Sequence, residues 1–166
     1  LGALAGVLIY YLARMIGANR RISALAGFLY IASGVAVANG RFAHNDLYLQ
    51  LFTILCVLFV VKYQSNNSMV WLYASFFSVG LAASSKYTGG SIILLPIAVF
   101  LMANWQQLRT RWLSMAGSLF LGGIISFFGY ALGTPKAFFA PIQYFTSIIP
   151  FLRNYPQYGF NSGSPI

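Results

Sequence analysis

The sequence has few charged residues, and acidic ones are almost absent. Only 7% of its 166 residues are charged, and Asp46 is the single carboxylate beside ten lysines and arginines. A soluble domain has about 25% charged residues, so this chain cannot cover a water-facing surface. The composition therefore excludes an ordinary soluble domain.

Cysteine and histidine are also scarce, with one residue of each. The single cysteine, Cys56, excludes an internal disulfide and lies in an apolar run, which is typical of a small helix residue and not of a redox centre. No second His or Cys lies near His44 to complete a zinc site. A hard cation such as Mg²⁺ or Mn²⁺ on Asp46 and Asn45 stays open, but it needs oxygen ligands from elsewhere. The sequence makes no cofactor certain.

Apolar residues are abundant instead, at 59% of the chain with a mean hydropathy of +0.74. In lipid every backbone polar group must be paired within the chain, and long continuous apolar runs favour helices over barrel strands. We therefore predict an all-α, polytopic transmembrane helix bundle with about six membrane segments. The segments are 1–16, 22–39, 47–61, 69–84, 88–103 and 113–132.

The pattern predicts two regions, a transmembrane bundle at 1–133 and an outer-side region at 134–166. In the second region, apolar residues at helical spacing after Pro141 predict an amphipathic helix on the membrane surface. Its apolar positions are Phe138, Ile142, Phe145, Ile149 and Leu152. Because the chain starts inside an apolar run and ends in a Gly/Ser/Pro-rich stretch, we expect it to be a fragment.

The basic residues divide between the two ends of the alternating segments. Six lie on one side, which the positive-inside rule makes cytoplasmic: Arg14, Arg20, Arg21, Lys62, Arg109 and Arg111. Four lie on the other, outer side: Arg41, Lys86, Lys136 and Arg153. Four cations beside one carboxylate on the outer side favour an anionic ligand near the outer leaflet. An equally good interpretation is that the four cations are anchors that contact lipid phosphates.

Asp46 lies in a dense polar cluster with Arg41, His44 and Asn45. The following run, 47–61, is short for a crossing, so an upstream extension of its helix brings this cluster to the membrane boundary. An ionisable residue there is costly and indicates a functional site. The alternative is that Asp46 caps the helix, with Arg41 as its partner.

A second polar stretch, 84–90, contains Lys86 and Tyr87 between two short spans. A lysine beside hydroxyls and a helix start can bind phosphate. The alternative is a snorkelling lysine with an interfacial tyrosine. Gly89 and Gly90 let backbones approach closely here.

Three segments in this order resemble the GT-C class of membrane glycosyltransferases, in its branch of protein O-mannosyltransferases and lipid A aminoarabinose transferases (glycosyltransferase family 39). Residues 40–49 (GRFAHNDLYL) resemble the branch's motif of an Arg followed by a polar or acidic residue at a helix start. Residues 80–89 (GLAASSKYTG) resemble its Lys-Tyr stretch, and residues 133–139 (GTPKAFF) resemble its entry into an outer amphipathic helix.

The resemblance implies transfer of a sugar from a polyprenyl-phosphate donor to a protein, lipid or glycan acceptor on the outer side of the membrane. It implies that Asp46, with His44, has an accessory catalytic role, because the family's main acidic pair lies in an outer loop with no counterpart here and is expected upstream of Leu1. The implied phosphate-binding residues are Arg41, Lys86, Tyr87, Lys136 and Arg153.

Two other functions fit the outer cations without chemistry: a transporter or flippase segment for an anionic lipid or solute, and a non-catalytic scaffold subunit. A nucleic-acid partner is not expected despite the net charge of +9, because the cations lie between apolar spans and form no basic stripe.

Overall fold

The computed structural model describes residues 1–34, 45–144 and 146–150, and all regular secondary structure within these ranges is helical. This confirms the all-α prediction. The elements are α1 (Gly2–Met15), α2 (Arg20–Ala32), α4 (Asn45–Asn66), α5 (Met69–Ser85), the 3₁₀ helix η1 (Tyr87–Ile93), α6 (Leu94–Ala103), the 3₁₀ turn η2 (Trp105–Gln107), α7 (Trp112–Gly133) and α8 (Lys136–Phe139). They fall into two compact units, Leu1–Gly133 and Thr134–Ile166.

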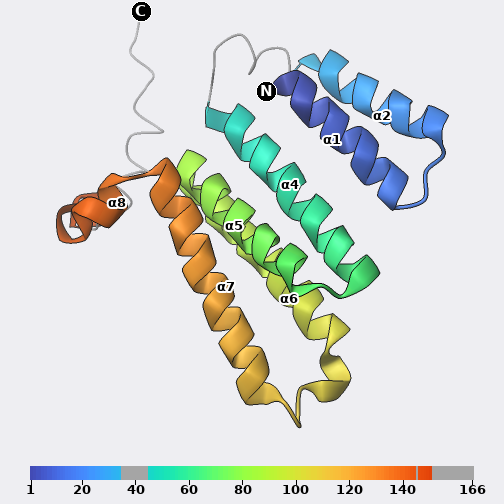
Figure 1. Cartoon of the computed structure of the whole chain (residues 1–166). Coiled ribbons are helices and arrows are strands. Elements are labelled where there is room, and N and C mark those ends of the chain that lie inside the picture. Colours follow the sequence, from blue (N-terminus) through green and yellow to red (C-terminus); the bar gives the residue numbers. More distant parts are fainter. Residues whose placement is uncertain (35–44, 145, 151–166) are drawn as a thin grey trace, which may run out of the picture. The chain divides into compact units, whose positions relative to one another are not determined.

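In the first unit, short connections make consecutive helices antiparallel, so that α1 runs against α2 and α4 against α5 (Figure 1). The helix α5 packs between α4 and α7, and α1 packs against both α2 and α4. The tight turn between α1 and α2 uses Gly17 at a φ of 95°, and Asn19 caps α2 by accepting a 2.9 Å hydrogen bond from the Ile22 N–H. The buried core joins four helices: Cys56, Val60 and Tyr63 of α4, Leu72, Phe76 and Val79 of α5, Val99 and Phe100 of α6, and Met115 of α7.

Glycines allow α5 and α7 to approach closely. A Cβ atom on Gly80 would lie 2.7 Å from the backbone nitrogen of Tyr130 and closer still to the Ser126 carbonyl oxygen. A Cβ atom on Gly129 would collide with the Phe77 carbonyl oxygen in the same way. Small residues at a helix interface are typical of membrane bundles, where close packing drives association because lipid is as apolar as the side chains.

The helix α4 is longer than the apolar run at 47–61 predicted, because it also includes residues 62–66, which we expected to be a polar connection. Two contacts explain the extension. The Lys62 ammonium lies 4.0 Å from the centre of the Trp71 ring, and the buried Tyr63 hydroxyl accepts a 3.0 Å hydrogen bond from the Asn104 side chain. A helix of 22 residues rises about 33 Å, and α4 and α7, both of this length, are long and apolar enough to cross a membrane.

The other apolar helices are shorter, and the span expected at 88–103 is divided into two parts. It begins with seven residues of 3₁₀ helix in η1 and continues as ten α-helical residues in α6. Because a 3₁₀ helix rises about 2.0 Å per residue, η1 and α6 together reach about 29 Å, close to the thickness of the hydrocarbon core. The 3₁₀ geometry thus makes the segment longer than the same residues would be in an α-helix.

The second unit contains α8, which ends at Phe139. At the next residue, Ala140, φ is −141° and ψ is 59°, so the backbone is not helical there. Helical structure resumes at residues 141–144 and 146–150. The amphipathic helix that we predicted is therefore interrupted before Pro141, because proline has no N–H and disfavours helical backbone in the residue before it. Phe138, Ile142 and Ile149 are exposed, whereas Phe145 and Leu152 lie outside the described residues.

Candidate functional site

The structure brings together Asp46 and Lys86, which are 40 residues apart in the sequence. The Lys86 Nζ donates a 2.9 Å hydrogen bond to the Asp46 Oδ1, and the side chains are 39% and 31% exposed. Asp46 is in the first turn of α4, and Lys86 is the residue between α5 and η1. The sequence identified both residues as site candidates but did not predict their contact.

The backbone holds Lys86 in place from both sides. Its extended conformation, with φ −153° and ψ 129°, ends α5. Its N–H donates to the Ala82 carbonyl at 3.1 Å, and its own carbonyl accepts from the Gly89 N–H at 2.8 Å. These two bonds fix the backbone position from which the Lys86 side chain extends.

The pair contributes little to stability. A partly exposed ion pair is worth about 0–1 kcal/mol, although a carboxylate at the start of a helix also interacts favourably with the helix dipole. Ionisable groups near a membrane are costly to place and are functional candidates for that reason. The pair is therefore a candidate functional site.

A second polar contact, between Tyr30 of α2 and Gln50 of α4, was not predicted. The Tyr30 hydroxyl donates a 2.8 Å hydrogen bond to the Gln50 Oε1, and both side chains are partly buried. The signal in the sequence was that Gln50 is the one amide side chain in the apolar run 47–61. It places a further polar group one helical turn from Asp46.

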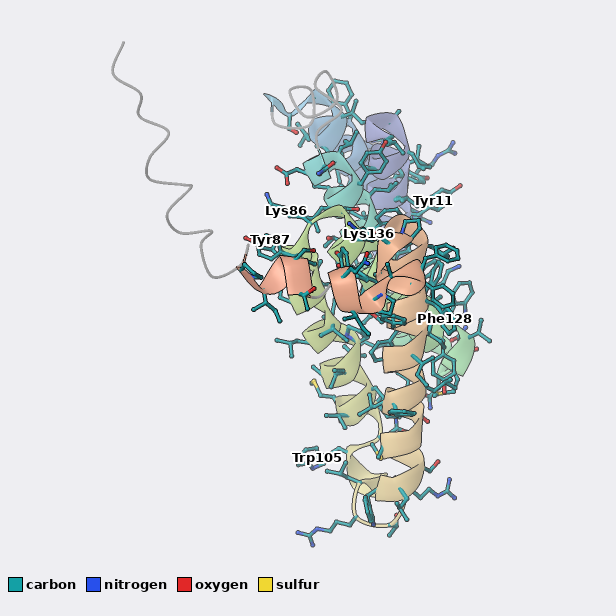
Figure 2. All side chains as sticks on the ribbon, turned by 90° about the vertical axis from the view of Figure 1, so that its left-hand side faces the viewer. Tyr11, Lys86, Tyr87, Trp105, Phe128 and Lys136 are labelled. Carbon is teal, nitrogen blue, oxygen red and sulfur yellow. The ribbon has the colours of Figure 1, made fainter. Side chains whose placement is uncertain are left out.

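The residues around Lys86 match the expected phosphate-binding stretch only in part. The hydroxyls of Ser84 and Ser85 donate to the Leu81 carbonyl at 2.8 and 3.0 Å, so their hydrogens bond the helix backbone instead of pointing to a ligand. Tyr87 is 48% exposed beside Lys86. Figure 2 shows both residues well above Trp105, which lies toward the lower end of the bundle in this view.

Gly89 and Gly90 play unequal parts in this stretch. A Cβ atom on Gly89 would lie 2.5 Å from the Ala82 carbonyl oxygen, whereas one on Gly90 would make an ordinary 3.8 Å contact with Ala83. The predicted close approach of backbones is thus confirmed at Gly89, and it is wrong at Gly90.

Four further predicted site residues lie outside the described residues or in the second unit. Arg41, His44 and Arg153 lie outside the described residues, and Lys136 begins α8 in the second unit. Asn45, the first residue of α4, is exposed. Within 1–34, 45–144 and 146–150, no group of three or more His, Cys, Asp or Glu residues could hold a metal ion.

The basic residues of the opposite end lie as the alternating segments predicted. The connections between α1 and α2, between α4 and α5, and between α6 and α7 share one end of the first unit (Figure 1). At or beside them are Arg14, Arg20, Arg21, Lys62, Arg109 and Arg111. The Asp46–Lys86 pair is at the other end.

Two helices long and apolar enough to cross a membrane, in a bundle with a charged pair at one end, are typical of an integral membrane protein. Residues 1–152 match the family of dolichyl-phosphate-mannose-protein mannosyltransferases, and the chain belongs to this family. The match confirms the resemblance drawn from residues 40–49, 80–89 and 133–139, and it gives the chain a place among membrane glycosyltransferases.

A curated relative is "Putative mannosyltransferase YkcB" of Bacillus subtilis (strain 168). It is 28% identical over 121 residues, which are 70% of this chain and 17% of the relative. The chain thus spans a small part of that relative's length. No solved structure matches the chain significantly.

Proposed function

We propose that this chain is part of a membrane mannosyltransferase that takes its sugar from a polyprenyl-phosphate donor and transfers it to an acceptor on the outer side of the membrane. The observation that carries the proposal is the hydrogen-bonded pair of Lys86 and Asp46 at one end of a family-matched bundle. The acceptor is a protein, a lipid or a glycan.

The reaction requires two kinds of group. The acceptor hydroxyl attacks C1 of the sugar while the bond from C1 to the phosphate oxygen breaks, and the phosphate leaves with the electron pair. A cation stabilises the charge that grows on the phosphate, and a carboxylate takes the proton of the acceptor hydroxyl. Lys86 supplies the first kind of group, whereas Asp46 is the single carboxylate of the chain.

The contact between the two side chains suggests how the site responds to the donor. An ammonium group has three N–H donors, so Lys86 can bond a phosphate oxygen in addition to, or in place of, the Asp46 carboxylate. The arriving phosphate then weakens the contact between Lys86 and Asp46. In this proposal Asp46 and His44 assist a main acidic residue elsewhere in the complete gene product.

The family resemblance implies further residues for this site. In this proposal Arg41, Tyr87, Lys136 and Arg153 also bind the donor phosphate, and a Mg²⁺ or Mn²⁺ ion on Asp46 and Asn45 needs further oxygen ligands from elsewhere. The shorter helices cross the membrane together with α4 and α7, and the end that carries Lys86 faces outward.

The test is sugar transfer by the complete gene product with polyprenyl-phosphate mannose as donor. We expect Lys86→Ala and Asp46→Asn to lower turnover by about 100-fold or more, the usual cost of losing a group that stabilises transition-state charge. Arg109→Ala is the matched control, because Arg109 is an exposed cation at the opposite end. Wild-type turnover in both site variants would remove these residues from the site.

A transporter or flippase segment for an anionic lipid or solute is the alternative function for the same cations. The family match favours transfer over transport. Movement of the lipid across vesicle membranes, without any sugar transfer by the same preparation, would favour the transporter.

A further inference from the structure

The contact between Tyr30 and Gln50 lies close to the charged pair. Gln50 follows Asp46 by four residues on α4, so the two side chains share one face of the helix, with Cβ atoms about 6 Å apart. Asp46 bonds Lys86, which lies at the junction of α5 and η1, and Gln50 bonds Tyr30 of α2. One face of α4 thus presents a carboxylate and an amide between these two neighbours.

The Gln50 amide has bonding capacity that this contact does not use. A glutamine amide has two N–H donors and two acceptor sites on its oxygen, and the Tyr30 hydroxyl occupies one acceptor site. Every fully buried side-chain nitrogen and oxygen in the described part of the chain has a partner. The Gln50 Nε2 has no such partner there, so it is not fully buried, and the bond to Tyr30 fixes the direction in which it points.

We infer that Gln50 binds a hydroxyl group of the donor sugar and that Tyr30 is the residue that positions it. An amide both donates and accepts hydrogen bonds, as a sugar hydroxyl does. A neutral amide also suits a position one turn further into an apolar helix, where a charged group would be costly. The inference rests on the proposed function, with the phosphate at Lys86 and the sugar beside it.

The test compares donors as well as variants. The complete gene product is assayed with polyprenyl-phosphate mannose and with the four donors that each lack one ring or C6 hydroxyl. Gln50→Leu is expected to lower kcat/KM for the native donor about tenfold, the upper range for one neutral hydrogen bond. With one of the deoxy donors, the wild type is expected to show the same loss of kcat/KM, because the hydroxyl that Gln50 binds is missing. With that donor, Gln50→Leu is expected to lower kcat/KM no further.

Tyr30→Phe removes one hydroxyl and keeps the ring, so it serves even where Gln50→Leu does not fold. Tyr30→Phe is expected to lower kcat/KM for the native donor less than Gln50→Leu does, and to cause no loss with that same deoxy donor. The matched control is Tyr11→Phe, because Tyr11 is exposed and its hydroxyl makes no hydrogen bond within the described residues. Its removal is expected to leave kcat/KM unchanged for every donor.

The outcomes separate the two proposals. A wild type that transfers no mannose would overturn the proposed function and this inference with it. A wild type that transfers mannose, with Gln50→Leu and Tyr30→Phe each losing the same factor with all five donors, would overturn the inference alone. Tyr30 and Gln50 would then simply hold α2 against α4.

Discussion

At the scale of single residues, the ammonium group of Lys86 is a compact charge on a flexible stem, fixed at its backbone by Ala82 and Gly89. A guanidinium keeps the charge but is larger and planar, so it reaches a phosphate with different geometry. We therefore expect Lys86→Arg to retain part of the activity, about tenfold below wild type and about tenfold above Lys86→Ala, with each tenfold step equal to about 1.4 kcal/mol.

Steady-state kinetics with polyprenyl-phosphate mannose measures this order. An arginine variant no more active than the alanine variant would argue against a role based on charge.

The sequence identified Asp46 and Lys86 separately because each interrupts apolar surroundings. It could not predict that they bond to each other, since that contact depends on how α4 packs against α5 and on where η1 begins. The same limit applied to Tyr30 and Gln50, which lie on two helices whose relative register no local pattern determines.

At the scale of elements, η1 is held against α5 by the close approach of Gly89 to the Ala82 carbonyl. Gly89→Ala is therefore expected to destabilise the protein by about 1–3 kcal/mol through overpacking and to lower transfer further by displacing Lys86. Thermal unfolding in detergent and the transfer rate below the transition measure the two effects.

Gly90→Ala provides the matched control, because its new methyl group would meet Ala83 at an ordinary 3.8 Å. Equal stability and activity in the two alanine variants would contradict the packing described for η1.

Hydropathy predicted the helices better than their ends. The run at 113–132 became α7 at Trp112–Gly133, because its polar flanks and length leave little choice. The predicted end of α4 was wrong, because Lys62 and Tyr63 continue the helix. They do so through contacts with Trp71 and Asn104, which lie elsewhere in the bundle. The 3₁₀ geometry of η1 has no signature in apolar periodicity.

At the scale of the whole molecule, the proposed function requires that the end of the first unit with Lys86 faces outward. Cys56 is fully buried, so Cys56→Ala gives a background for single reporters at Thr88→Cys and Arg109→Cys. We expect a membrane-impermeant maleimide to label Thr88→Cys on intact cells and Arg109→Cys only after permeabilisation. The reverse pattern would place the Lys86 end on the cytoplasmic side and contradict a site that faces outward.

The double variant Asp46→Asn/Lys86→Met tests the central claim most directly, because it distinguishes a site from a structural ion pair. Removing both partners of a structural pair relieves the unpaired charge that each single variant leaves. If Asp46 and Lys86 act on the donor and acceptor, the double variant will transfer mannose no faster than the weaker single variant. Recovery of the double variant to the wild-type rate would contradict that claim.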